Sequence, residues 1–166
     1  MTTPNNFSPP RRIANGVDFN RLLLIIAVLT KRAGLKLFNQ DIIVNVTGGL
    51  RVNEPAVDLG IALAIASSFR DAEPISGLVA LGEVGLNGEL RGVSHAERRI
   101  AEAIRLGFKS CLVPRLPTTI ASEMKQSFHS ADIHLIEVGS VAEALRLGLI
   151  REGKKESAKG ENTGQE

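Results

Sequence analysis

Apolar residues concentrate in the middle of the chain, directly after a short segment that has the pattern of a strand. Residues 41–46 are rich in β-branched side chains and predict a strand, which a Thr-Gly-Gly turn at residues 47–49 ends. Pro55 suits the first turn of a helix, where its missing N–H leaves no bond unmade. Almost every residue from 56 to 66 is Ala, Val, Leu, Ile or Gly. We therefore predict a buried helix that continues to about residue 70, with small side chains that let a sheet approach closely.

A second apolar run precedes this segment and predicts another buried helix. Asp18 suits the N-cap of a helix from Phe19 to about Ala33, and Gly34 suits its end. Basic residues in the last turn favour a helix, because they interact well with the carboxyl end of the helix dipole. Residues 22–29 are apolar on every side, so a strand is the alternative. The length of the segment and its capping residue favour the helix.

Strand and helix patterns alternate after the central helix, which is typical of an α/β fold with a single core. The expected elements are a turn-rich loop over residues 71–77, a strand over 78–84, a tight hairpin over 85–88 that returns through 89–91, a strand over 110–113 ended by Pro114, a weaker helix over 119–127 and a strand over 133–138.

Two further helices carry sequence signals at their amino ends. Ser94 and Glu97 have the spacing of a capping box before a helix that ends at Gly107. Ser140 and Glu143 repeat this spacing and predict the start of the final helix.

The chain divides into three segments by composition. Residues 1–16 contain three prolines and few apolar side chains, which predicts an extended lead. Residues 17–150 hold all the predicted helices and strands, and they are numerous enough for a proper core. Residues 151–166 are almost entirely polar, which predicts a disordered tail.

The overall composition is that of a soluble globular protein, with 43% hydrophobic and 23% charged residues. The longest apolar run is too short to cross a bilayer, and the start lacks the apolar segment of a secretory signal. We therefore expect a cytoplasmic protein that has no membrane partner. Cys111 is the only cysteine and lies in an apolar strand, which fits a reducing compartment and a core position better than a nucleophile.

The formal net charge of +2 hides an uneven distribution. Residues 1–36 carry six basic side chains and one acidic side chain, so six minus one gives +5 for this part alone. A basic end of this kind suits contact with a phosphate backbone. The alternative is a solvated helix end next to a charged linker, which a charge count does not exclude.

Several blocks of the sequence resemble one known family over most of the chain. They are PRRIANGVDFNRLLLIIAVLTKRAGLKLFNQDIIVNVTGG at residues 10–49, EPAVDLGIALAIASS at residues 54–68 and GEVGLNGELRGVSHAERRIAEAIRLGFKSCLVP at residues 82–114. These blocks resemble the Lon-protease-like domain that closes the bacterial RadA (Sms) DNA repair proteins. The resemblance runs from about Pro10 to Leu149. It implies an α/β fold like the Lon proteolytic domain, a two-layer or three-layer βαβ arrangement with a mixed sheet and packed helices.

The resemblance also raises the question of peptidase activity. Lon-type peptidases use a Ser–Lys dyad, in which a desolvated lysine takes the proton of the serine. Asp58 occupies the serine position here and Glu97 occupies the lysine position. No serine lies between Ser8 and Ser67, and no lysine lies between residues 36 and 109. We therefore expect no catalytic residues and no enzyme activity for this chain alone.

Asp58 and Glu97 have ordinary structural explanations. Asp58 falls in the first turn of the central helix, where the dipole favours a carboxylate by roughly 0.3–1 kcal/mol. Glu97 is a member of the first capping box. An acid–base couple or a metal site built from these two carboxylates is the alternative, and we expect neither.

The sequence contains no recognisable cofactor site. His95, His129 and His134 lack metal-ligand spacing with each other or with the cysteine, so no metal site is expected. The glycine pair at residues 48–49 predicts a turn, because no P-loop or dinucleotide motif accompanies it. In the RadA family, ATP, Mg and Zn would belong to a zinc-binding segment and a RecA-like ATPase that precede the Lon-like domain.

The resemblance implies a role in recombinational repair. In the family, the Lon-like domain is a non-proteolytic platform that helps to form a hexameric ring and contacts double-stranded or branched DNA during branch migration. Self-association and recombination proteins are therefore expected as partners. The basic residues that match family motifs, and that are candidates for DNA contact or for intersubunit ion pairs, are Arg11, Arg12, Arg21, Lys31, Arg32, Arg91, Arg98, Arg99 and Lys109.

Two other functions remain as alternatives. An ATP-dependent Lon-type serine peptidase domain is one, and the missing dyad argues against it. The Lon-like module at the amino end of magnesium-chelatase-like ATPases is the other, since it shares the E-x-x-x-D-L pattern at the central helix. The N-R-L and N-Q-D blocks argue against this second alternative. Family members also continue upstream of residue 10 with a further strand. If that strand is missing, one sheet edge or groove is uncovered, and the chain is a fragment, a truncated reading frame or a free-standing module.

Overall fold

The computed structural model describes residues 1–5, 9–115, 126, 128 and 133–150 of the chain. These residues form a mixed α/β fold. Its elements are β1 (Thr2–Pro4), β2 (Arg12–Asn15), α1 (Phe19–Arg32), β3 (Gln40–Asn45), η1 (Thr47–Gly49), η2 (Pro55–Val57), α2 (Asp58–Arg70), β4 (Leu78–Ala80), β5 (Glu83–Val84), β6 (Leu90–Arg91), α3 (Ala96–Arg105), β7 (Ser110–Pro114), β8 (His134–Val138) and α5 (Val141–Gly148).

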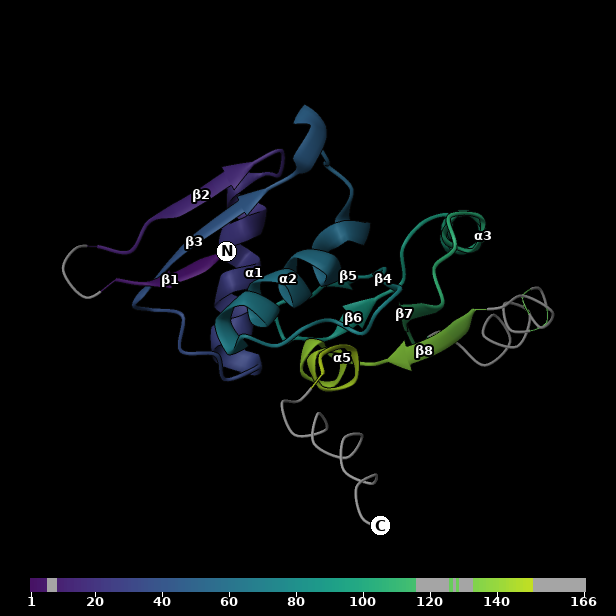
Figure 1. Ribbon diagram of the computed structural model, residues 1–166. Helices are drawn as coiled ribbons and strands as arrows, with labels where there is room; N and C mark the ends of the chain where they lie inside the picture. Colours follow the sequence, from purple (N-terminus) through teal and green to yellow (C-terminus); the bar gives the residue numbers. More distant parts are fainter. Residues whose placement is uncertain (6–8, 116–125, 127, 129–132, 151–166) are drawn as a thin grey trace, which may run out of the picture.

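The strands form two separate three-stranded sheets and a short hairpin. The first sheet has the order β1-β3-β2, in which β3 runs antiparallel to β1 and parallel to β2. The second sheet has the order β4-β7-β8 and is parallel throughout. The hairpin pairs β5 with β6. Figure 1 shows α2 between the two sheets, with α1 behind the first sheet.

The helix α1 begins and ends where its capping residues predict. The side chain of Asp18 accepts a hydrogen bond from the backbone N–H of Arg21, which satisfies one of the free amides of the first turn. Gly34 follows the helix with a φ of +69°, a conformation that favours glycine. The buried side chains of α1 are those of Leu22, Ile25, Ile26, Val28 and Leu29. The choice of a helix over a strand for this run is therefore confirmed.

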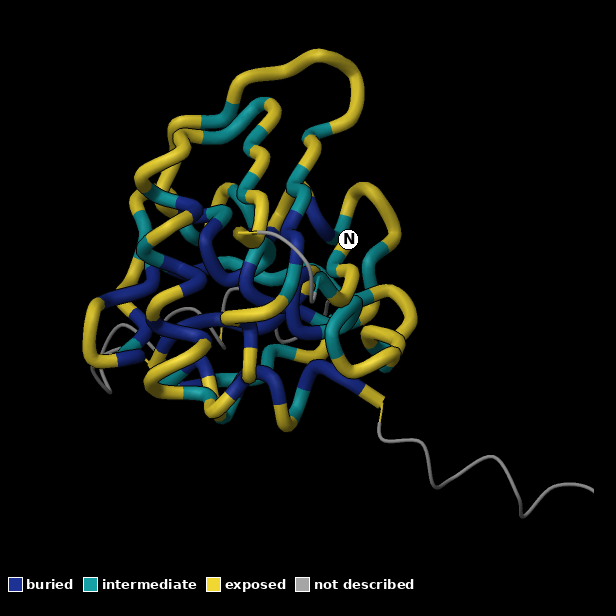
Figure 2. Tube along the Cα trace, turned by 90° about the vertical axis from the view of Figure 1, so that its left-hand side faces the viewer, coloured by how far each residue is buried: buried dark blue, intermediate teal, exposed yellow. Residues whose placement is uncertain are grey.

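The helix α2 lies at the centre of the core. Leu59, Ala62, Leu63, Ile65 and Ala66 are buried, and the helix packs against α1, α5, β1 and β5. The largest cluster of buried side chains combines these residues with those of α1 and α5. Figure 2 shows the buried positions gathered in the middle of the molecule and exposed loops around them.

A smaller cluster lies between α3 and the second sheet. Ile100, Cys111 and Val113 are its buried members. The prediction that Cys111 is a core residue is confirmed, since the side chain is fully buried. Burial raises the pKa of the Cys111 thiol to about 12, which keeps it in the unreactive protonated form.

Residues 1–16 are extended, as expected, but they are also part of the first sheet. Thr2 pairs with Ile42, and Ile13 pairs with Ile43, so β1 and β2 flank β3 on both sides. The expected lead thus supplies both neighbours of the central strand. The sheet edge that a missing upstream strand was expected to uncover is occupied by residues 2–4.

The strand expected over residues 78–84 is divided at Gly82. The backbone N–H of Leu81 still donates to Leu112 of β7, but the N–H of Gly82 donates to Ala56 instead. The N–H of Leu59 in turn donates to the carbonyl of Gly82. The chain therefore leaves the sheet at Gly82 and binds the start of α2.

The capping box expected at the start of α3 is absent. The N-cap is His95, in a left-handed conformation with a φ of +57°, and its side chain makes no capping hydrogen bond. Glu97 is exposed in the first turn. The second capping position is confirmed, because the hydroxyl of Ser140 accepts from the N–H of Glu143. The helix expected over residues 119–127, the position of His129 and the tail expected over residues 151–166 lie outside the described residues, apart from residue 126.

The close contact at Gly16 yields a stability prediction. Gly16 has a φ of +80°, and a Cβ there would lie 2.5 Å from the carbonyl oxygen of Leu50 and 2.7 Å from Cβ of Val46. Gly34 has a φ of +69° but no atom within 4 Å of such a Cβ. We expect Gly34→Ala to lower the free energy of unfolding by about 1–2 kcal/mol from backbone strain alone. Gly16→Ala should cost about 1–3 kcal/mol more because of the clash, and chemical denaturation measures both. Equal losses in the two variants would show that the loop after β3 moves away freely.

Candidate functional site

Asp58, which the family resemblance places at the peptidase serine position, lies inside the protein. It is fully buried at the start of α2. Nε of Arg21 donates to Oδ1 of Asp58 over 2.9 Å, and a terminal guanidinium nitrogen of Arg21 donates to Oδ2. The backbone N–H of Val84 in β5 donates to the same Oδ2 over 3.1 Å. The carboxylate therefore joins α1, α2 and β5.

Arg21 is held in place by its backbone as well as by its side chain. It lies in the first turn of α1, where its N–H donates to Asp18 over 2.8 Å. Glu83 lies 3.6 Å from the same guanidinium and adds a second negative charge. Hydrogen bonding to Asp58 raises the pKa of Arg21 above its ordinary value. The contact with Asp58 therefore stabilises the charged form of Arg21.

The expectation for Asp58 was incomplete. The structure confirms that Asp58 lies in the first turn of the central helix, and it also buries the carboxylate against an arginine. A charged residue at the start of an otherwise apolar helix signals such a partner, because an unpaired buried charge is very costly. Arg21, in the first turn of the other apolar helix, is that partner.

Glu97, which the resemblance places at the lysine position, lies in a different setting. Glu97 is exposed on α3, whereas Asp58 is buried between α1 and β5. Within the described ranges, no group of three or more His, Cys, Asp or Glu side chains is arranged to hold a metal ion. The same part of the chain contains no helix long and apolar enough to cross a membrane.

Arg11 and Arg12 form hydrogen bonds that connect β2 to β3 and to the segment before it. The N–H of Arg11 and its Nε donate to the carboxylate of Asp41 over 2.7 and 3.2 Å. The guanidinium of Arg12 donates to the carbonyls of Gln40 and Leu37, the latter over 2.9 Å. Hydrogen bonds from the side chain of Asn5 and from the backbone of Arg11 hold the pKa of Asp41 below its ordinary value.

The remaining candidates for DNA contact fall into two groups. Arg91 pairs with Glu89 over 2.7 Å, and Arg99 pairs with Glu54 over 2.6 Å. The exposed candidates are Lys31, Arg32, Arg98 and Lys109, of which Arg32 donates to the side chain of Asn87 over 3.0 Å. The nine residues therefore differ in whether their charges already have partners within the described part of the chain.

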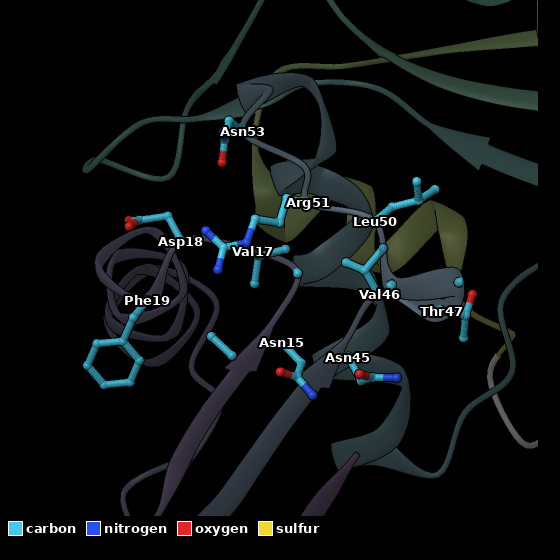
Figure 3. Close-up of a pocket in the computed structure, with 14 residues that line it drawn as sticks. Asn15, Val17, Asp18, Phe19, Asn45, Val46, Thr47, Leu50, Arg51 and Asn53 are labelled. Carbon is cyan, nitrogen blue, oxygen red and sulfur yellow. The ribbon is translucent and has the colours of Figure 1, made fainter.

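A polar pocket lies where the parallel strands β2 and β3 end. It has a volume of about 560 Å³ and is lined by residues 14–19, residues 45–51 and Asn53. Figure 3 shows the side chains of Asn15 and Asn45 next to each other at the ends of their strands, and Arg51 extending towards the start of α1. Sequence reasoning did not select Arg51, because it lies in a loop and matches no motif. The glycine turn after β3 was predicted, but its place beside a pocket was not.

The comparisons with known proteins place the chain beside two sets of relatives. A family model described as subunit ChlI of Mg-chelatase matches residues 21–116. The DNA repair protein RadA of Bacillus subtilis is 46% identical over 149 residues, which is 90% of this chain and 31% of that protein. RadA of Synechocystis is 45% identical over 90% of this chain and 28% of that protein, and RadA of Streptococcus pneumoniae is 42% identical over 88% and 33%. The chain thus spans about a third of the length of these curated relatives.

The ion pair between Arg21 and Asp58 yields a prediction of strong coupling. Asp58→Leu leaves the half-buried guanidinium of Arg21 with only Glu83 at 3.6 Å, and Arg21→Met leaves a fully buried carboxylate. We expect each single substitution to lower the free energy of unfolding by about 3–5 kcal/mol. The double variant should recover a large part of this loss, because no unpaired charge stays inside.

The matched control is Arg11→Met, which removes an arginine whose side chain is 75% exposed. It should cost no more than about 1 kcal/mol. Urea denaturation of all four variants completes the test. Additive losses from the two single substitutions would contradict the assigned pair.

Proposed function

Because the chain belongs to the family described as subunit ChlI of Mg-chelatase and matches RadA proteins over nine-tenths of its length, we propose that it is the Lon-like module of a RadA-type DNA repair protein. In this proposal the module has no peptidase activity. It serves as a scaffold of a hexameric ring and binds double-stranded DNA during branch migration. ATP, Mg and Zn belong to other domains of such a protein.

The extent of the similarity to RadA is the observation that carries this proposal. The matches cover 88–91% of the chain for several bacterial RadA proteins, so the sequence similarity extends over most of the described elements. The burial of Asp58 supports the non-proteolytic part. A hydrolytic serine needs an accessible hydroxyl beside a base, and this position is closed by Arg21 and by the amide of Val84.

The exposed cations support contact with DNA. Lys31 and Arg32 lie together in the last turn of α1, and Arg98 and Lys109 are exposed elsewhere. Contacts of this kind go to phosphates and carry no sequence information, so the binding we propose is independent of sequence. Arg91 and Arg99 already face carboxylates on the same chain, which makes them weaker candidates.

A module of a magnesium-chelatase-like ATPase is the second candidate. The description of the matching family model favours it over residues 21–116. The names of the relatives favour the first candidate over a longer part of the chain. DNA binding separates the two, because only the repair module requires it.

We expect the purified chain to bind a short fluorescent DNA duplex at low salt. The logarithm of the association constant should fall linearly with the logarithm of the salt concentration between roughly 50 and 200 mM, since each phosphate contact releases a counterion. Lys31→Glu combined with Arg32→Glu should weaken binding, and the charge-preserving pair Lys31→Arg with Arg32→Lys should not. Fluorescence anisotropy measures affinity, and size-exclusion chromatography with and without duplex reports assembly. If the wild-type chain does not bind DNA at 50 mM salt, the assignment as a repair module is wrong.

The closed position of Asp58 predicts that the chain cleaves no protein. Casein and peptide substrates should stay intact at every concentration of the purified chain that is tested. Asp58→Ser should also be inactive, because the new hydroxyl would face Arg21 rather than a neutral lysine. Cleavage assays with a Lon-type peptidase as the positive control check both statements. Turnover by the wild-type chain would overturn the non-proteolytic assignment.

A further inference from the structure

We propose that the polar pocket at the ends of β2 and β3 holds the phosphodiester backbone of a DNA strand, with Arg51 as its charged contact. This inference rests on the proposed function and locates one contact that the nine cations selected from the sequence do not include. It is carried by the shape of the pocket, by the chemistry of its side chains and by the charge of Arg51.

The pocket lies between the paired ends of β2 and β3 and the loop that follows β3. Asn15 and Asn45 are partners in the parallel register of β2 and β3, so their side chains lie on the same face of the sheet. The loop after β3 returns to this place, because the N–H of Val52 donates to the carbonyl of Gly16 over 2.8 Å. The volume of about 560 Å³ lies within the range of roughly 300–1,000 Å³ that small-ligand sites occupy.

The polar side chains of the pocket are available to bind a ligand. Within the described part of the chain, the side chains of Asn15, Asn45, Asn53 and Thr47 form no hydrogen bond. All four residues are exposed and line the pocket. Asparagine amides, threonine hydroxyls, arginine and main-chain N–H groups are the groups that proteins use to contact phosphates and sugars of DNA. The pocket therefore offers donors that suit a backbone and not one particular base.

Arg51 is one of the surface arginines that have no carboxylate partner. Arg11, Arg91, Arg99, Arg105 and Arg115 each face a carboxylate, whereas Arg51, like Arg70, Arg98 and Arg146, makes no ion pair or hydrogen bond among the residues described. Arg51 is the one of these four that lines the polar pocket. Asp18 also lines the pocket, but its carboxylate accepts the N–H of Arg21 and is directed away from Arg51 in Figure 3. No ion pair joins Asp18 to Arg51, so the guanidinium is free for a ligand.

The charge of the pocket selects the type of phosphate. The lining contains one cation, Arg51, and one carboxylate, Asp18, which is already bonded to the first turn of α1. The single positive charge of Arg51 matches the single negative charge of a phosphodiester. A nucleoside triphosphate carries several negative charges, and the pocket offers no lysine and no carboxylate cluster for a metal ion. The loop over residues 47–51 is exposed and lies at the top of Figures 1 and 2, so a long strand can reach the pocket without crossing the body of the protein.

Two variants separate the charged and neutral parts of the site. Arg51→Gln should weaken binding of the fluorescent duplex at 50 mM salt by about tenfold and reduce the slope of the salt dependence by about 0.9, the value of one phosphate contact. Asn15→Ala combined with Asn45→Ala should also weaken binding but leave the slope unchanged, because amides displace no counterion. Arg70→Gln is the matched control, since Arg70 is exposed at the far end of α2 and has no ion pair in the described structure. It should bind as the wild-type chain does. Urea denaturation of each variant confirms that the fold is intact.

The outcomes distinguish this inference from the proposed function. If the wild-type chain binds duplex and both pocket variants bind equally well with an unchanged slope, the pocket assignment is wrong and the repair module stands. If neither the wild-type chain nor any variant binds DNA, the proposed function is wrong, and the pocket assignment that rests on it is wrong too. A polyglutamate peptide that binds the wild-type chain as tightly as DNA does, and that loses affinity in Arg51→Gln, would assign the pocket to an acidic protein segment instead.

Discussion

The contact between Arg21 and Asp58 determines how the two apolar helices meet. Apolar packing has no direction of its own, so the alternation of leucines and isoleucines on α1 and α2 allows more than one register. The buried carboxylate accepts hydrogen bonds from Arg21 and from the amide of Val84, which fixes the first turns of both helices beside β5. A single carboxylate thus fixes how α1, α2 and β5 meet.

The elements with strong local signals were predicted well from the sequence. Asp18 caps α1 and Gly34 follows its end, because capping depends on residues that are adjacent in the chain. The strand β3 and the glycine turn after it were also confirmed. Local signals failed where distant contacts decide the structure. Residues 2–4 form β1 only because β3 offers an edge, and the break at Gly82 arises because its backbone binds the start of α2.

The candidate site was predicted less completely, for an electrostatic reason. Charge counts show where cations occur along the chain but not which of them already have partners. Arg21 donates hydrogen bonds to Asp58, and Arg12 donates hydrogen bonds to the carbonyls of residues 37 and 40. Arg51 matches no motif, so only its surroundings in the folded chain show that it is free. The similarity to RadA proteins gave the family context but could not sort these residues, because similarity of sequence does not report which side chains touch.

The buried thiol of Cys111 has a practical consequence for spectroscopic work on this protein. The chain contains one cysteine, and it is sealed between α3 and the second sheet in its protonated form. Maleimide probes attack thiolates that they can reach, so this residue is protected as long as the fold holds. A cysteine introduced on the surface would therefore take up a fluorophore or spin label selectively in the native background. Distances between labelled copies could then be measured without first replacing a core residue.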